Sequence, residues 1–238
     1  MHLPEAFFTL HRDLPREGPG LPEDVAWVAA RLDTARVQRI LDGASGPGSD
    51  IATLLTAFSP ESLHAADWME HFIAQVEADF GDDPRVTATR GDMFEVPGPF
   101  DLIWCAGAIY FAGVAQSLRR WSEQLAEDGV IAFSAPCYFD DEPSDIARAL
   151  WATEGDIPTR TKVFQEIADA GFALIASRPL SDAAWEAYYG PQLARVAQLW
   201  PDADAALRAV LDEARQEAAV WRAAKDETGY ELCVVRRA

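Results

Sequence analysis

The sequence predicts an α/β fold with one doubly wound, mostly parallel sheet. Short apolar runs of strand length alternate with segments in which apolar residues recur at helical spacing. Small or acidic residues follow most of the apolar runs. Strands that alternate with helices are joined by right-handed crossovers and form a parallel sheet with helices on both faces. With 238 residues, 49% of them hydrophobic, the chain is long enough for one large core.

The first half of the chain contains five expected strands, at residues 37–41, 62–66, 86–89, 100–105 and 130–134. A helix is expected before them at 22–32, because proline is favoured in a first helical turn and Pro22 occupies that place. Gly129 is expected at the C-terminal end of the helix that precedes the fifth strand. The helices between the strands are indicated by three apolar sets: Ile51, Leu54, Leu55 and Phe58; Met69, Phe72, Ile73, Val76 and Phe80; Val114, Leu118, Trp121 and Leu125.

The second half departs from this alternation. A short helix around Val163 precedes a sixth strand at 172–176, and a seventh at 230–235 is expected to be antiparallel. Two further helices are expected between them, one from Leu193 that ends near Pro201 and one from Leu207 to Trp221. We therefore expect an N-terminal lid and helix over 1–36 and a main domain over 37–238, with insertions at 137–158 and 178–228.

Composition narrows the classes of partner. The chain has 20 Lys and Arg against 39 Asp and Glu, a net charge of −19, which disfavours nucleic acid and anionic membrane surfaces as partners. The three cysteines form no CxxC pair, so neither a zinc site nor a disulfide framework is expected. The N-terminus lacks the apolar stretch of a signal peptide. We expect a cytoplasmic protein, and a homodimer is compatible with the sequence but not indicated by it.

The carboxyl ends of the expected strands point to one ligand site. Asp42, Asp67, Asp92 and Cys105 each stand at or just beyond such an end. Ligands of open α/β sheets bind beyond the carboxyl ends of the strands. The first strand leads into the loop Asp42-Gly43-Ala44-Ser45-Gly46-Pro47-Gly48, whose small residues allow a ligand to approach the backbone. Such a loop suits a dinucleotide such as NAD as well as other ligands.

This loop resembles the first motif, D/E-x-G-x-G-x-G, of class I S-adenosylmethionine (SAM)-dependent methyltransferases, with Ala44 in place of the first glycine. The resemblance extends over the expected strands up to residue 177 and the last strand. It implies a Rossmann-like, seven-stranded sheet whose last strand is antiparallel, helical lid elements, and SAM as cofactor. The loop residues implied to bind SAM are Asp42, Gly43, Ala44, Ser45, Gly46 and Gly48.

The resemblance assigns further cofactor contacts at the next strand ends. Asp67 would accept hydrogen bonds from the ribose hydroxyls, and Trp68 would pack on the adenine ring. Asp92 would accept from the adenine amino group, the amide of Met93 would donate to the ring, and Cys105 belongs to the strand beside the methionyl part. Alternatively, Asp67 caps the helix that starts near Met69, since Asp is a favoured helix cap.

The implied reaction is methyl transfer to a small-molecule acceptor by in-line displacement, catalysed mainly by positioning. Tyr110, His11 and Tyr188 are the candidate catalytic groups, followed by Tyr189, whereas His64 and His71 are expected to be structural. The segments 14–20 and 185–191 resemble lid stretches of a small-molecule branch of the family. The aromatic residues outside the core pattern would line an acceptor pocket or pack the lid onto the sheet: Trp151, Trp185, Tyr188, Tyr189 and Trp200.

Several absences bear on the type of enzyme. The segment after the fourth strand, starting at Cys105, lacks the Asn/Asp-Pro-Pro-aromatic motif of DNA amino-methyltransferases. It also lacks the aspartate of metal-dependent catechol-type enzymes, so no metal is expected. Two alternatives remain open: an NAD-dependent oxidoreductase, and a non-catalytic SAM-binding or interaction protein.

Overall fold

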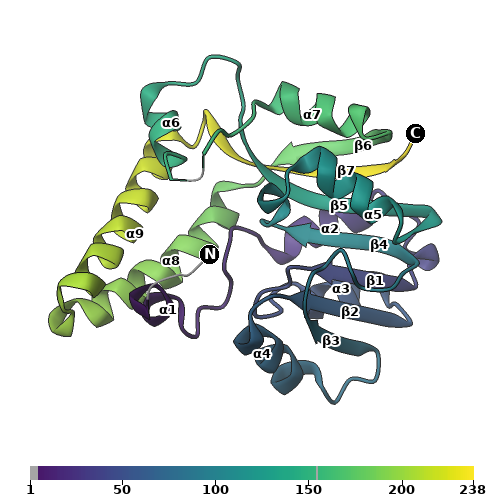
Figure 1. The fold of residues 1–238 in the computed structure, drawn as a ribbon, viewed down its shortest axis with the longest axis horizontal. Coiled ribbons are helices and arrows are strands. Elements are labelled where there is room, and N and C mark those ends of the chain that lie inside the picture. Colours follow the sequence, from purple (N-terminus) through teal and green to yellow (C-terminus); the bar gives the residue numbers. More distant parts are fainter. Residues whose placement is uncertain (1–4, 154) are drawn as a thin grey trace.

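The computed structural model describes residues 5–153 and 155–238. Within them lies a seven-stranded sheet of order β3-β2-β1-β4-β5-β7-β6, in which only β7 runs antiparallel to its neighbours (Figure 1). The predicted fold class is confirmed. The last strand of the chain lies between β5 and β6, inside the sheet. The strands are β1 (Arg39–Gly43), β2 (Ser62–Asp67), β3 (Val86–Arg90), β4 (Phe100–Ala106), β5 (Leu125–Tyr138), β6 (Phe172–Pro179) and β7 (Thr228–Arg237).

Helices cover both faces of the sheet, because neighbouring strand residues point to opposite sides. Ile40 and Leu102 face a cluster with α2 (Pro22–Ala29), α3 (Ile51–Phe58) and α4 (Glu70–Phe80). Leu41 and Ile103 face a second cluster with α5 (Val114–Ser122) and α7 (Arg160–Asp169). The short 3-10 helices are η1 (Thr34–Arg36), η2 (Ile109–Phe111) and η3 (Trp200–Asp202).

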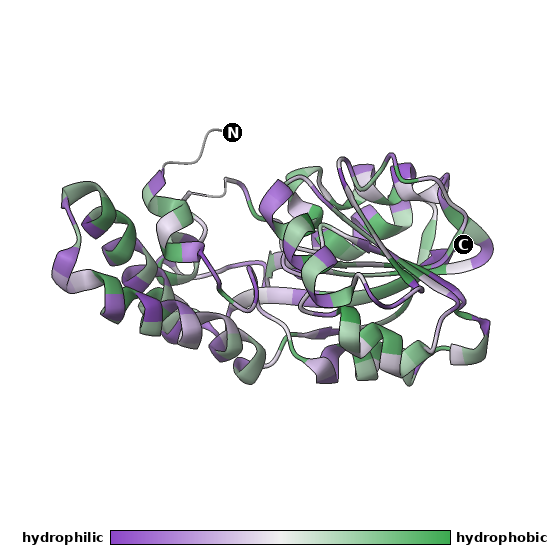
Figure 2. Cartoon of the chain, turned by 90° about the horizontal axis from the view of Figure 1, so that it is seen from below, coloured by the Kyte–Doolittle hydropathy of each residue, from purple (hydrophilic) through white to green (hydrophobic). Residues whose placement is uncertain are grey.

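A helical lobe projects from one end of the sheet (Figures 1 and 2). It consists of α1 (Glu5–His11), α8 (Asp182–Leu199) and α9 (Ala205–Ala224), and α6 (Asp145–Leu150) packs beside α9. The lobe has an apolar core of its own, made by Leu10, Val196, Ala203, Leu211 and Ala214. Because α8 follows directly after β6, which runs parallel to β5, the lobe begins at the carboxyl edge of the sheet.

Aromatic side chains join the lobe to the sheet. Trp185 of α8 stacks on Trp221 of α9, with ring centroids 5.2 Å apart, and meets Tyr230 of β7 edge to face at 5.3 Å. Trp151 stacks on Tyr230 at 5.9 Å, and Tyr189 lies 5.7 Å from Trp185. Of the two predicted roles for the extra aromatic residues, packing onto the sheet is the one that Trp151, Trp185 and Tyr189 fulfil.

Two elements differ from the sequence expectation. Helix α8 begins at Asp182, eleven residues before Leu193, and continues through Pro191, a residue that usually ends helices. Gly129 lies in β5, not at the end of α5, which stops at Ser122. A side chain at Gly129 would approach the Phe100 carbonyl oxygen to 2.8 Å, so the glycine permits the close contact of β5 with β4 beside an irregularity in their pairing.

Among the helices of residues 5–153 and 155–238, none combines the length and the apolar character that crossing a bilayer requires.

Candidate functional site

The glycine loop after β1 is tied to the neighbouring strand β2. The Ser45 amide donates to the Ala66 carbonyl oxygen at 3.1 Å, and the Gly46 amide donates to Asp67 Oδ2 at 2.9 Å. Within the loop, the Gly48 amide donates to the Ser45 carbonyl oxygen at 3.0 Å. Small residues suit this loop because the chain turns sharply there from β1 into α3, next to the end of β2.

Ala44, which replaces the first glycine of the motif, has φ +57°. Left-handed backbone costs a residue with a Cβ about 1–2 kcal/mol, whereas glycine adopts it freely but loses about 0.5–1 kcal/mol more entropy on folding. We therefore expect Ala44→Gly to raise the free energy of unfolding by about 0.5–1 kcal/mol, measured by urea denaturation. The same substitution at exposed Ala52, inside α3, should lower it by about 1 kcal/mol. A lower free energy of unfolding for Ala44→Gly would contradict the inferred backbone strain at this position.

Asp67 ends β2 and joins three segments. Its Oδ2 accepts from Gly46, as described, and its Oδ1 accepts from the Met69 amide at 2.8 Å, just before α4. Burial raises the pKa of Asp67, and these backbone hydrogen bonds partly oppose that effect. The alternative of a helix-capping aspartate is not realised, because Met69 is the N-cap residue of α4 and Asp67 binds the amide of that residue rather than one inside the helix. The carboxylate is fixed in position, with lone pairs left on both oxygens.

Asp42, at the end of β1, is buried, and its Oδ2 has no hydrogen-bond partner among the described residues. Burial raises the pKa of Asp42 well above its usual value, and the nearby carboxylates of Asp50 and Asp67 raise it further. The nearby cation Arg16 lowers the pKa by less than these effects raise it, so the charged form remains costly in the folded protein.

The raised pKa of Asp42 predicts a pH-dependent effect of Asp42→Asn. An acid whose pKa is higher in the folded state binds protons more tightly there, so its contribution falls as pH rises above the unfolded value of 3.8. We expect Asp42→Asn to be more stable than the wild type by about 1–3 kcal/mol at pH 8, with the gain vanishing near pH 4. Thermal unfolding at both pH values measures this. A gain that is equal at the two pH values would contradict it.

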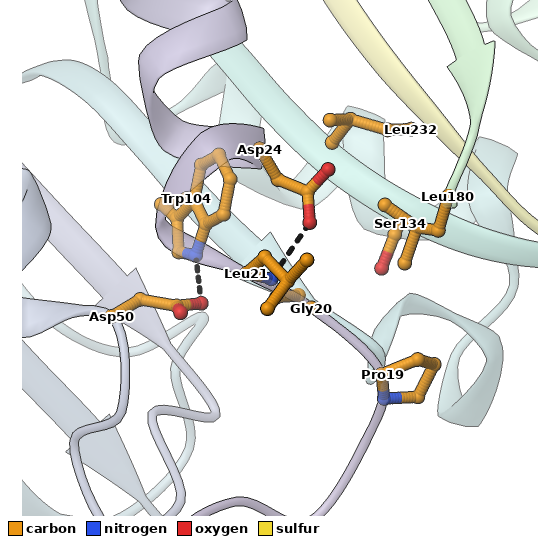
Figure 3. Close-up of a pocket in the computed structure, with 10 residues that line it drawn as sticks. Pro19, Gly20, Leu21, Asp24, Asp50, Trp104, Ser134, Leu180 and Leu232 are labelled. Atoms are coloured by element: carbon orange, nitrogen blue, oxygen red, sulfur yellow. Dashed lines mark hydrogen bonds between the residues drawn. The ribbon is translucent and has the colours of Figure 1, made fainter. Parts of the chain in front are cut away.

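The N-terminal segment 14–20 crosses the glycine loop. Ser49 Oγ donates to the Pro15 carbonyl oxygen at 2.7 Å, and Arg16 Nη2 lies 3.5 Å from Asp50 Oδ1. Asp50 also accepts from Trp104 Nε1 of β4 at 2.9 Å (Figure 3). Between this segment and the ends of β4, β5 and β7 lies a cavity of about 10 Å³, room for about one water. Its lining includes Pro19, Gly20, Asp50, Trp104, Ser134 and Leu232.

The remaining predicted cofactor residues stand around the same edge. Trp68 is 65% exposed, so a ligand can reach its ring. Asp92 accepts from the Phe94 amide at 3.0 Å and from Arg120 Nη2 at 2.9 Å. Met93 is buried, with Sδ 3.3 Å from the place a side chain at Gly43 would take. The Cys105 thiol is buried in the apolar cluster on the α5 face, so only its backbone can face a ligand.

The candidate catalytic residues come from three separate elements. His11 Nδ1 lies 2.6 Å from Glu17 Oε2, and Glu17 Cγ lies 3.9 Å from the place that a side chain on Gly46 would take. Tyr188 OH accepts from Gln192 Nε2 at 3.2 Å. Burial raises the pKa of Tyr188, and the charges of Glu217 and Glu17 and then Tyr110 raise it further. Of the three candidates, His11 is tied to the glycine loop, through Glu17.

Other polar candidates point elsewhere. Tyr189 OH donates to Glu217 Oε1 at 2.9 Å, within the lobe. His64 Nδ1 lies 2.9 Å from Thr87 Oγ1, its buried Nε2 lacks a partner among the described residues, and burial lowers its pKa. His71 contacts the rings of Phe8 and Phe72. Among the residues that the structure describes, no group of three or more His, Cys, Asp or Glu could hold a metal ion.

The structure is similar over its whole length to solved methyltransferases. A SAM-dependent methyltransferase from Geobacter sulfurreducens, in complex with S-adenosyl-L-homocysteine, is 20% identical, with a TM-score of 0.83 over 99% of both chains. One from Thiobacillus denitrificans, with the same ligand, is 19% identical, with a TM-score of 0.82 over 100% of both chains. E. coli YjhP is 20% identical, with a TM-score of 0.83 over 99% of this chain and 100% of that chain. No family model and no curated protein matches the sequence.

The chain has the class I methyltransferase fold. Its strand order, with β7 antiparallel between β5 and β6, departs from the all-parallel 3-2-1-4-5-6 order of the dinucleotide-binding fold.

Sequence reasoning missed four residues of this candidate site: Arg16, Glu17, Asp50 and Gln192. The first two lie in the segment 14–20, whose resemblance to a lid stretch assigns no role to its single residues. Asp50 precedes the first apolar residue of α3, a position in which an acid is ordinary. Gln192 follows Pro191, in a stretch for which the sequence predicts no helix. The face of α8 that carries Gln192 could therefore not be predicted.

Proposed function

We propose that this chain is a SAM-dependent methyltransferase that acts on a small-molecule acceptor. The observation that carries the proposal is the buried Asp67 carboxylate, fixed by the Gly46 and Met69 amides where the glycine loop meets the end of β2. A rigid acceptor with two oxygens suits a pair of ribose hydroxyls. The whole-length similarity to solved methyltransferases supports the same proposal.

The other residues of this edge fit the remaining parts of SAM. Trp68 offers an exposed ring face to the adenine, and Asp92, held by Arg120, offers carboxylate oxygens to its amino group. The residues Gly43, Ala44, Ser45, Gly46 and Gly48 have a small side chain or none, which suits a loop that takes a ligand close to its backbone. Asp42 Oδ2, buried without a partner, fits a positively charged group, since a neighbouring cation would restore its ionised form.

Bound SAM supplies a methyl group on a sulfonium sulfur, which is already activated for displacement. The protein then needs to position the acceptor and exclude water. Segment 14–20 and the lobe of α1, α8 and α9 are suited to cover the acceptor. For an acceptor that must lose a proton, Glu17 pairs with His11 at 2.6 Å and would orient it, and Tyr110 and Tyr188 are the further candidate groups.

Calorimetric titration of the purified protein with SAM, S-adenosyl-L-homocysteine and NADH tests the proposal. We expect micromolar binding of the two adenosyl ligands and none of NADH. A folded protein that binds neither adenosyl ligand would overturn the methyltransferase assignment. Binding of NADH alone would restore the oxidoreductase alternative.

A further inference from the structure

Two buried side-chain oxygens, one on α8 and one on segment 14–20, have no hydrogen-bond partner among the described residues. Gln192 is 2% exposed, and its amide nitrogen is used in the hydrogen bond to Tyr188 OH, but its Oε1 has no partner among the described residues. An unpaired polar atom in such a place costs free energy, and native proteins retain few of them. A buried carbonyl oxygen of this kind points to a ligand that donates a hydrogen bond.

Glu17 presents the second oxygen. Its Oε2 is paired with His11 Nδ1, while Oε1 is buried and has no partner in the described part of the chain. The side chain stands against the glycine loop, with Cγ 3.9 Å from the place of a side chain on Gly46. The carboxylate therefore lies between the proposed cofactor loop and the lobe, where an acceptor has to reach the methyl group.

The elements that carry the two oxygens pack against each other. Arg195, three residues beyond Gln192 on α8, donates from Nη2 to the Thr9 carbonyl oxygen of α1 at 3.5 Å, and His11 of α1 pairs with Glu17. The Tyr188 hydroxyl accepts from Gln192, and the charges of Glu217 and Glu17 act on it. This place is rich in hydrogen-bond acceptors and carries negative charge, and it also holds Arg195, whose buried Nε is unpartnered among the described residues.

We propose that the methyl acceptor is a primary or secondary amine whose N–H groups donate to Glu17 Oε1 and Gln192 Oε1 beside Tyr188. This inference rests on the proposed methyltransferase function and names the class of its substrate. An ammonium nitrogen has only donors, and both of these open oxygens are acceptors. A carboxylate or phosphate acceptor would be attracted by Arg195 but repelled by both Glu17 and Glu217, and an ether or ester would leave both oxygens unsatisfied.

The chemistry balances with the groups present. The ammonium form gives one proton to the Glu17–His11 pair, which frees the nitrogen lone pair. That lone pair forms the new N–C bond while the S–C bond breaks, and the bonding electrons remain on sulfur. The positive charge thereby moves from sulfur to the methylated ammonium product, and the proton leaves to solvent afterwards.

A matched acceptor panel tests the substrate class. The protein, with radiolabelled methyl SAM, is offered aliphatic, aromatic and heterocyclic amines, each paired with the alcohol, thiol and carboxylic acid of the same skeleton. We expect label in amines and at least tenfold less in their partners. Labelling of the alcohols, thiols or acids in preference, or labelling of no amine by a protein that binds S-adenosyl-L-homocysteine, would overturn the inference. Failure to bind the adenosyl ligand would overturn the proposed function itself.

Two variants locate the amine. Gln192→Leu and Glu17→Gln should each raise KM for the best amine about tenfold or more, while the affinity for S-adenosyl-L-homocysteine stays unchanged. Gln192→Glu keeps an acceptor oxygen with nearly the same shape, and it should retain a KM within about threefold of the wild type. Gln75→Leu, on the exposed face of α4, is the matched control. Equal KM values for Gln192→Leu and Gln192→Glu would contradict the assignment.

Discussion

Asp67→Ala is expected to weaken the binding of S-adenosyl-L-homocysteine by about 10- to 150-fold, or roughly 1.5–3 kcal/mol. The substitution removes the proposed acceptor for the ribose hydroxyls. It also frees the Gly46 amide, which donates to Asp67 Oδ2 at 2.9 Å and holds the glycine loop in place. Calorimetric titration of the variant and the wild type under the same conditions gives the ratio of Kd values.

Two comparisons make this result specific. Asp79→Ala removes an exposed carboxylate from α4 that pairs with Gln75, and should leave Kd unchanged. Asp67→Asn keeps one acceptor oxygen and should fall between wild type and Asp67→Ala. An unchanged Kd in a folded Asp67→Ala protein would remove the ribose role and leave Asp67 as a structural link.

Arg16→Ala is expected to lower the free energy of unfolding by about 2–3 kcal/mol. Arg16 and Asp50 are both largely buried, with side-chain exposures of 13% and 11%, and their closest atoms are 3.5 Å apart. Removing one member of a buried ion pair leaves an uncompensated charge in a poorly solvated place. Urea denaturation measures the loss, and an unchanged slope m shows that it is a change of stability.

The partner substitution provides the control. Asp50→Asn keeps an oxygen that can accept from Trp104 Nε1 but removes the charge. In the Arg16→Ala background it should therefore recover most of the lost stability. Losses that simply add in the double variant would show that the two side chains act independently.

The sequence was most informative where local patterns decide the structure. Apolar runs such as 100–105 become strands and the spacing of Ile51, Leu54 and Phe58 becomes a helix, because burial of one face selects both. The parallel, doubly wound character of the sheet followed from crossover geometry. The gathering of Asp42, Asp67 and Asp92 at one edge followed from the shared direction of parallel strands.

The part of the site above the loop could not be predicted in the same way. Its residues come from α1, segment 14–20, η2 and α8, whose positions depend on packing between distant parts of the chain. Leu10 is one example, since it is buried against residues near 200–214 and gives no periodic signal in its own short helix. Pro191 is another, because a local rule predicts a break where tertiary packing of Tyr189 and Trp185 keeps the helix intact.

The position of β7 inside the sheet has a consequence for how the protein is made. Because synthesis proceeds from the N-terminus, β6 is complete while the strand that separates it from β5 is still missing. Until β7 has left the ribosome, β5 and β6 both present unpaired backbone edges, which are sites of aggregation. The nascent chain is therefore exposed to aggregation until β7 is made, and a chain without β7 would have a divided sheet.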